Sequence, residues 1–272
     1  MNEPVHNFRL APPLGRPAVQ SRGAGAMAPS ASIENSLLAA LPRPAYRRLL
    51  AGLESVTLSF GEVLYEPGET IRYVYFPGSS LVSLLTLADG HLALEVGLIG
   101  REGMVGIPLV LEHSVSSVRA LVQGTGTALR MASAPFREAF RLSPPLQKAL
   151  HRYTHTLMAQ ISQTAACNRF HVVEARLARW LLMTHDRVKS EQFRMTHEFL
   201  GHMLGVRRVG VTRAAHALQQ RMLIQYSRGD ITILDRGGLE AAACRCYEIV
   251  KDMHDGGVGG RAERKAHACA AA

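Results

Sequence analysis

The sequence lacks the features that would place a protein in or across a membrane. No stretch approaches ~18 consecutive apolar residues, the length at which a helix can span a bilayer. Near the N-terminus, Pro12, Gly15 and Pro17 interrupt any apolar run, so no secretory signal is predicted. Only four of the 272 residues are cysteines, too few for a disulfide framework. We therefore expect a cytoplasmic protein with no membrane partner.

The cysteines and histidines are also too scattered along the chain to predict a metal site. The four cysteines are Cys167, Cys244, Cys246 and Cys269. A Cys-x-Cys pair on a helix, such as Cys244 and Cys246, projects its thiols about 200° apart, and no second pair completes a zinc pattern. His151 and His155 are four residues apart but have no evident third ligand. We expect no metal, and reduced thiols that pack as small hydrophobes.

The motifs that would indicate an enzyme are incomplete. In HEFLGH, His197 and His202 are five residues apart and diverge by about 140° on a helix, whereas a zinc protease needs two histidines four apart. Three glycines lie between Gly100 and Gly106, but no Lys-Ser or Lys-Thr follows them as in a P-loop. Since no nucleophile–base pair is evident either, we do not expect an enzyme.

Acidic residues are missing from the whole interval between Glu198 and Asp230. The same interval contains Arg207, Arg208, Arg213, Arg221 and Arg228, and the chain has a formal net charge of +9. One sign of charge on a folded scaffold attracts a nucleic-acid backbone, because neutralised phosphates release condensed counterions. Basicity by itself does not distinguish DNA from RNA or from an anionic lipid.

This interval has the residue pattern of a helix-turn-helix. Thr196 is a good N-cap for a first helix, and Gly205 lies where a chain leaving a helix often needs a left-handed conformation. Gly201, four residues earlier, would let a second helix pack closely on the first. Apolar residues at i, i+3, i+4 and i+7 predict the buried face of that second helix: Val211, Ala214, Ala215 and Leu218.

The opposite face of the second helix would lie in solvent or in a groove. It consists of Arg208, Val209, Thr212, Arg213 and His216. Two short β-branched runs follow, Leu223–Gln225 and Ile231–Leu234, around a loop that contains Gly229. This is the pattern of a β-hairpin, which behind a recognition helix would be a wing.

The rest of the chain divides into segments of different composition. Residues 1–31 and 255–272 are rich in small residues without a period and predict a disordered leader and a disordered tail. Short β-branched runs with turns near every ten residues predict a β-roll within residues 32–142, after a proline-broken helix. Its turns are Phe60-Gly61, Pro67-Gly68, Pro77-Gly78 and Asp89-Gly90. Residues 143–169 predict a long helix, and 170–254 the winged region, which ends in a helix from Leu239 to about Met253.

The long helix has apolar residues at alternating steps of three and four. They are Leu146, Leu150, Tyr153, Leu157, Met158 and Ile161. Such a narrow seam suits a parallel contact with the same helix of a second copy. Packing against its own domain is an equal alternative for the first half of the helix.

Three stretches together resemble the Crp/Fnr superfamily of bacterial transcription factors. FGEVLYEPGE is similar to the entry into that family's roll, VEARLARWLL to the helix before its helix-turn-helix, and MTHEFLGHMLGVRRVGVTRAAHAL to the helix-turn-helix itself. The resemblance covers roughly residues 35–250. It implies an α+β fold with an N-terminal cyclic-nucleotide-binding-like β-roll, a long dimerisation helix and a C-terminal winged helix-turn-helix. It also implies a homodimer that binds double-stranded DNA, with RNA polymerase as a further partner.

In this family the recognition helix reads guanine edges with arginine. By position, Arg208 matches the leading base-contacting arginine and Arg213 a second contact. The family often has an acidic residue next, where this chain has Val209, so we expect a different half-site. The predicted DNA-binding residues are Thr196, Arg207, Arg208, Val209, Thr212, Arg213, His216 and Arg221, of which Arg207 and Arg221 are expected on phosphates.

The effector pocket departs from the pattern of the cyclic-nucleotide-binding members. Their Gly-Glu, which binds the ribose, is replaced by Gly106-Ile107, and their Arg-Ser by Ser116-Ser117. Arg119, two residues further on, is a candidate substitute for the phosphate-binding arginine. We therefore expect that cyclic AMP is not the effector, and that any effector-binding residues are Gly106, Ser116, Ser117 and Arg119.

Other sensory chemistry of the family is not expected either. The N-terminus has no cysteine cluster for an iron–sulfur centre, and His91 and His113 are expected at the surface of the roll rather than on a haem. Three classes of function stay open: a dimeric sequence-specific regulator, which we favour, an allosteric small-molecule-sensing module that acts through protein partners, and a nonspecific nucleic-acid-binding protein.

Overall fold

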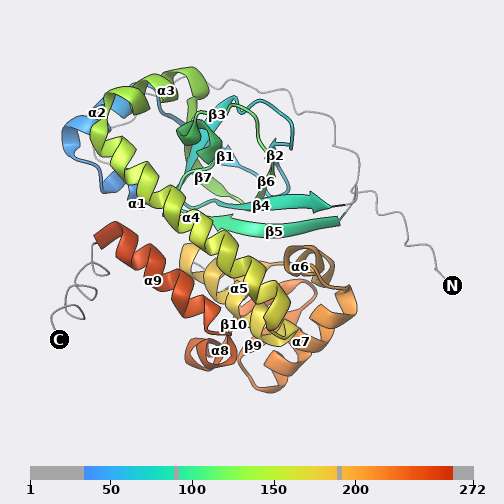
Figure 1. Ribbon diagram of the computed structural model, residues 1–272. Helices are drawn as coiled ribbons and strands as arrows, with labels where there is room; N and C mark the ends of the chain where they lie inside the picture. The colour runs from blue at the N-terminus through green and yellow to red at the C-terminus, as the bar shows by residue number, and fades with distance from the viewer. Residues whose placement is uncertain (1–33, 89–91, 189–191, 260–272) are drawn as a thin grey trace.

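The computed structural model describes residues 34–88, 92–188 and 192–259 and has the expected α+β architecture. A roll of antiparallel strands forms the N-terminal part, and a domain rich in helices forms the C-terminal part. The long helix α4 (Pro144–Phe170) runs from the roll into the C-terminal domain (Figure 1). In the described ranges, no helix combines the length and the hydropathy that a bilayer span requires.

Two antiparallel sheets form the roll, in the strand orders β1-β7-β3 and β2-β6-β4-β5. The strands are β1 (Glu54–Leu58), β2 (Val63–Tyr65), β3 (Tyr73–Pro77), β4 (Leu81–Ala88), β5 (Leu92–Ile99), β6 (Arg119–Gly124) and β7 (Gly126–Ala132). Gly61 and Gly68 have φ angles of 81° and 83°, which glycine adopts without a Cβ clash, so these two turns are confirmed. The predicted Asp89-Gly90 turn lies outside the described residues.

Short helices cover the far end of the roll (Figure 1). They are α1 (Ser36–Ala39), α2 (Arg43–Leu50), the 3-10 helix η1 (Ile107–Leu111) and α3 (Ser133–Leu142). The proline-broken helix is confirmed, since Pro42 separates α1 from α2 as the N-cap residue of the second. Proline is tolerated there because the first amides of a helix have no intrahelical acceptor.

The first half of α4 packs on its own domain. Leu146 and Leu150 are fully buried in the core of the roll, and Tyr153 and Leu157 are nearly so. Of the two alternatives for this seam, the structure therefore has the intramolecular one at these four positions. Met158, by contrast, is 62% exposed, so the face of α4 that remains open is a different one.

The C-terminal domain contains the predicted helix-turn-helix and wing. Its elements are α5 (Val173–Arg187), β8 (Gln192–Arg194), α6 (His197–Leu204), α7 (Arg208–Gln220), β9 (Ile224–Ser227), β10 (Asp230–Ile233), α8 (Arg236–Ala242) and α9 (Cys246–Gly259). The hairpin is confirmed, and β8 pairs with β10 as a further strand that the sequence did not indicate. The single helix expected from Leu239 to Met253 is wrong, because an extended Ala243 (ψ 154°) separates α8 from α9.

The two parts of the chain are packed together through an apolar joint. Leu81, Leu85 and Leu98 of the roll belong to the same buried cluster as the interior of the helix-turn-helix. Phe60 and Phe199 add a ring contact at 5.6 Å across this joint. Because these residues are separated widely in sequence, the position of the C-terminal domain depends on tertiary contacts and not on α4 alone.

Candidate nucleic-acid interface

The turn between α6 and α7 is built as the sequence predicts. Thr196 accepts a hydrogen bond from the amide of Phe199 at 3.1 Å and so caps α6. Gly205 ends α6 with a φ of 61°, in the left-handed region. At Gly201, a Cβ would lie 2.9 Å from the carbonyl oxygen of Val206, so glycine lets the turn approach the helix. These local interactions fix the angle at which α7 leaves the turn.

Helix α7 buries the predicted stripe and exposes the opposite face. Val211 and Leu218 are fully buried, and Ala214 and Ala215 nearly so, in the core that α5 and α6 share. The residues predicted to face DNA are exposed on this helix and at its start: Arg207, Arg208, Val209, Thr212, Arg213 and His216. A row of side chains on one rigid helix is the geometry needed to enter a major groove.

The arginines at the start of α7 are available for a polyanion. Within the described ranges, Arg207, Arg208 and Arg213 have no carboxylate within ion-pair distance. Unpaired exposed guanidinium groups retain their full charge for phosphate oxygens or for base edges. Val209 beside them is 55% exposed, an apolar contact surface within the basic row.

Arg221 is the exception among the predicted phosphate contacts. Its Nη1 lies 3.0 Å from Oε1 of Glu174, which comes from the first turn of α5. The acid-free interval of the sequence thus does not leave Arg221 without a partner, because the fold supplies an acid from 47 residues away. The pair is half exposed, so a phosphate could still compete for the guanidinium.

Thr212 is exposed, but its hydroxyl is engaged within the protein. It donates to the carbonyl oxygen of Arg208 at 3.0 Å and lies 3.0 Å from Nδ1 of His197. The ring of His197 stacks on Tyr226 of the wing, with centroids 4.1 Å apart. Burial, and then the nearby charge of Arg208, lower the pKa of His197. His197 therefore joins α6, α7 and the wing through its ring, a role that the sequence did not indicate.

The wing has a tight turn of two residues. Arg228 and Gly229 have φ angles of 51° and 94°, and Ser227 pairs directly with Asp230, as in a type I′ hairpin. The amide of Tyr226 donates to Oε1 of Gln219 at 2.9 Å, which fixes the wing to the end of α7. Arg228 is exposed at the tip of the hairpin and extends the positive charge beyond the helix.

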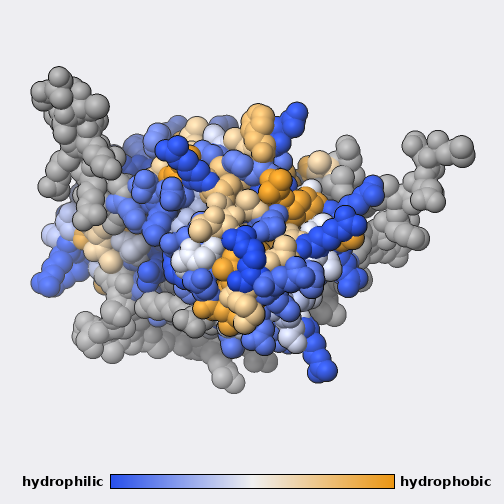
Figure 2. Space-filling view, turned by 90° about the horizontal axis from the view of Figure 1, so that it is seen from below, coloured by the Kyte–Doolittle hydropathy of each residue, from blue (hydrophilic) through white to orange (hydrophobic). Residues whose placement is uncertain are grey.

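Figure 2 views the end of the molecule at which α7, α8 and the wing lie in Figure 1. Strongly hydrophilic residues surround and interrupt a more hydrophobic centre on this face. The exposed residues of this domain include both classes, for example Arg213 and Val209. Such a surface offers charge for phosphates together with apolar contacts, which is the composition of an interface that reads a groove.

The structure places the four candidate effector residues in different environments. Gly106 has a φ of 109°, and a Cβ there would lie 2.9 Å from a side-chain carbon of Val74. Ser116 is buried and uses its hydroxyl on the backbone of Val118, whereas Ser117 is exposed. Arg119 forms an ion pair with Glu66 at 2.8 Å. Arg119, the candidate arginine for a cyclic phosphate, thus already faces a carboxylate.

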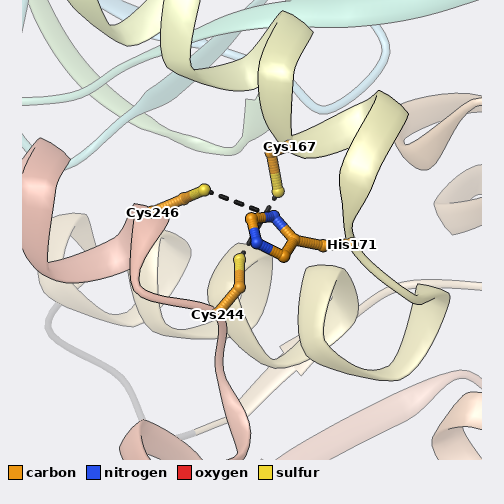
Figure 3. A group of neighbouring side chains, drawn as sticks. All are labelled: Cys167, His171, Cys244 and Cys246. Carbon is orange, nitrogen blue, oxygen red and sulfur yellow. Dashed lines mark hydrogen bonds between the residues drawn. The ribbon is translucent and has the colours of Figure 1, made fainter.

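The fold brings together cysteines that the sequence separates. Cys167, Cys244 and Cys246 meet His171 where α4, α5 and α9 join, with their ligand atoms all within 4.8 Å of one another (Figure 3). All three cysteines are free and buried, as expected, but their separation along the sequence does not keep them apart in the fold. The divergence expected of a helical Cys-x-Cys pair does not apply, because Cys244 lies in the loop before α9 and not on one helix with Cys246.

Among the comparisons with known proteins, the most specific match is to the C-terminal part of the chain. Residues 175–242 match the model of the Crp-like helix-turn-helix domain, and no curated protein matches the chain significantly. Among solved structures, a c-di-GMP-responsive global regulator from Xanthomonas campestris, CLP, is 18% identical with a TM-score of 0.59 and covers 71% of this chain and 99% of its own. FixK2 from Bradyrhizobium japonicum is 15% identical with a TM-score of 0.61 and covers 71% and 98%. A crp/fnr-family regulator from Eubacterium rectale is 17% identical with a TM-score of 0.61 and covers 78% and 99%.

Proposed function

We propose that the chain is a sequence-specific, DNA-binding transcription regulator of the Crp/Fnr superfamily, because residues 175–242 match the Crp-like helix-turn-helix domain and its fold is similar to that of solved regulators. The observation that most strongly supports this function is the row of exposed arginines at the start and on the open face of α7, for which the described part of the chain supplies no carboxylate partner. In the cell, a homodimer would place two such helices on two half-sites of one operator.

The residues of the interface differ in how far they would extend into the groove of the DNA. Arg208 lies at the N-terminal end of α7, the part of a recognition helix that inserts deepest, and would hydrogen-bond a guanine edge. Arg213 and His216, further along the exposed face, would make the second set of groove contacts. Val209 would meet a thymine methyl. Arg207, Arg221 and Arg228 lie at the margins and would steady the phosphate backbone.

Cyclic AMP is not the effector in this proposal. The ion pair between Arg119 and Glu66 supports this reading, because a cyclic phosphate would have to displace a carboxylate that is already bound. Gly106-Ile107 also offers no carboxylate for a ribose hydroxyl. The signal that the roll transmits to the DNA-binding domain would then have a different chemistry.

The function is tested by selecting DNA fragments from a random library with the full chain and by measuring their complexes in gel shifts with competitor DNA. A specific regulator should return a two-fold symmetric motif and a complex that survives excess unrelated DNA, since specific sites typically bind 10³–10⁷-fold more tightly. A complex that dissolves in competitor would instead indicate nonspecific binding. No complex at all would favour a module that acts through protein partners.

A further inference from the structure

Three cysteines and one histidine converge at the joint between α4, α5 and α9, outside the DNA-binding face. Cys167 is in the last turns of α4, His171 follows that helix, and Cys246 begins α9 with Cys244 two residues before it. The three thiols are free, and each of the three cysteines is buried. Figure 3 shows the sulfur atoms arranged around the imidazole ring.

The spacing of these atoms is that of a ligand set for one ion. Zinc binds sulfur at ~2.3 Å and nitrogen at ~2.0–2.1 Å, so a tetrahedral site places two sulfurs ~3.8 Å apart and a sulfur and a nitrogen ~3.6 Å apart. The Sγ atoms of Cys167 and Cys244 are 3.5 Å apart, and Sγ of Cys246 is 3.5 Å from Nδ1 of His171. Since no ligand pair exceeds 4.8 Å, a movement of about 1 Å would complete the tetrahedron.

We propose that Cys167, His171, Cys244 and Cys246 bind one zinc(II) ion in a closed, structural site. Three thiolates and an imidazole form a ligand set that selects zinc among the common divalent ions, because the soft sulfur donors disfavour magnesium and calcium. Four protein ligands leave no open position for water or substrate, so the role of the ion is to stabilise the fold rather than to catalyse a reaction.

The surroundings suit such an ion. Nε2 of Gln163 lies 3.0 Å from Sγ of Cys246 and donates to it, as partners of metal-bound thiolates do. Zinc with three thiolates has a net charge of −1, and the buried guanidinium groups of Arg176 and Arg179 lie close enough to interact with the cysteines.

A disulfide is the competing use of these cysteines. The sulfur atoms of Cys167 and Cys244 are 3.5 Å apart, whereas a disulfide bond needs ~2.05 Å. A disulfide between Cys167 and Cys244 would also not account for the equally close approach of Cys246 to His171. One ion uses all four groups, which is why we favour the metal.

The site would join parts of the chain that are far apart in sequence. Cys167 and Cys244 are separated by 77 residues, and the whole helix-turn-helix and wing lie between them. A bound ion would therefore fix α9 and the end of α4 at the base of the DNA-binding domain. Binding of a metal to the folded state alone adds to its stability by mass action.

The test uses the full chain, purified under reducing conditions without oxygen. We expect one zinc(II) per chain by elemental analysis, and after exchange for cobalt(II) the thiolate charge-transfer absorption and visible bands of a tetrahedral site. Cys246→Ser should weaken cobalt(II) binding at least ~10-fold. His155→Ala, which changes an exposed histidine of α4 that is not in the cluster, is the control and should bind cobalt(II) as the wild type does.

Two results would overturn the proposal. One is a folded, reduced wild-type chain that takes up no stoichiometric cobalt(II) or shows no thiolate charge-transfer band. The other is a Cys167–Cys244 disulfide in freshly alkylated protein, detected by mass spectrometry. Both readouts are obtained on the wild-type chain, so they stand even if a cysteine variant fails to fold. Neither involves DNA, so failure of the metal site is distinguishable from failure of the proposed function.

Discussion

The indole Nε1 of Trp180 donates a hydrogen bond to Oε1 of Glu95 at 2.9 Å, and so connects α5 of the DNA-binding domain to β5 of the roll. Glu95 is only 7% exposed, and its other oxygen lies 2.7 Å from the hydroxyl of Ser83. Ser83 also contacts Oε1 of Gln123. Ser83 donates to Glu95, so Ser83 and Trp180 each supply one hydrogen bond to this buried carboxyl group.

This arrangement predicts a pH dependence of stability. Burial raises the pKa of Glu95 from 4.5 to about 7. The folded pKa is above the unfolded one, so the stabilisation is present below pH ~4.5 and is lost as the pH rises through ~7. Glu95→Gln keeps an oxygen for Trp180 but does not titrate. Between about pH 5 and about pH 8, the free energy of unfolding of the wild type should therefore fall by ~1–3 kcal/mol relative to that of the variant.

Urea unfolding of the two proteins at both pH values measures this difference. The wild-type curve alone would not isolate the effect of Glu95, because burial also lowers the pKa of His254 from 6.5 to about 4. That shift makes the folded state more stable as the pH rises from about 4 to about 6.5, which is opposite to the effect of Glu95. Parallel stability curves for wild type and Glu95→Gln would show that the carboxyl group is ionised throughout.

Arg208 should specify one base pair. Arg208→Ala is expected to weaken binding by ~1–3 kcal/mol per half-site and to flatten the preference at one position of the motif, because a bidentate contact to guanine is lost. Selection on random DNA and titrations of the chosen sites measure both effects. Arg207→Ala, which removes the neighbouring arginine expected on a phosphate, is the control and should weaken binding without changing the motif. An unchanged motif for Arg208→Ala would move the role of base reading to Arg213.

Arg221 should act on all sequences alike. Arg221→Ala is expected to reduce the salt slope of binding by at most ~1 per half-site without changing the motif. Glu174→Gln should have the opposite effect, a slightly steeper salt dependence, because it releases the guanidinium from its ion pair. Binding measured across a series of salt concentrations tests both variants. A changed motif in either one would mean that Arg221 reaches the bases.

The roll should not bind cyclic AMP at micromolar concentration. A ligand phosphate would have to separate Arg119 from Glu66, and Gly106-Ile107 leaves the ribose without a carboxylate. Calorimetric titration of the full chain checks this. Micromolar binding that disappears in Arg119→Ala would contradict the prediction and would make Arg119 the phosphate ligand.

The exposed face of α4 should contribute to a homodimer, whereas its buried face should not. Met158→Glu is expected to weaken self-association with little effect on the stability of the roll, because Met158 is 62% exposed. Leu150→Ala should instead cost ~2–5 kcal/mol of stability, because Leu150 is fully buried in the core of the roll. Sedimentation and urea unfolding separate the two effects. A Met158→Glu protein that sediments unchanged would exclude this face from the dimer contact.

The sequence by itself determined the features whose physics is local. The cap at Thr196, the left-handed Gly205 and the buried stripe from Val211 to Leu218 depend on residues within about one or two helical turns. The hairpin around Gly229 depends on its own turn residues in the same way. The expected helix-turn-helix and wing are therefore present in the structure, although the two strands of the wing extend further into the loop than expected.

Only the tertiary structure decided which distant residues meet. It gave Arg221 a partner in Glu174, placed Leu150 in the core of the roll, and gathered Cys167 with Cys244. An apolar helical face has the same period whether a second copy or its own domain covers it, and a single cysteine has no period at all. Such pairings follow from the packing of whole elements, which local propensity and spacing do not specify.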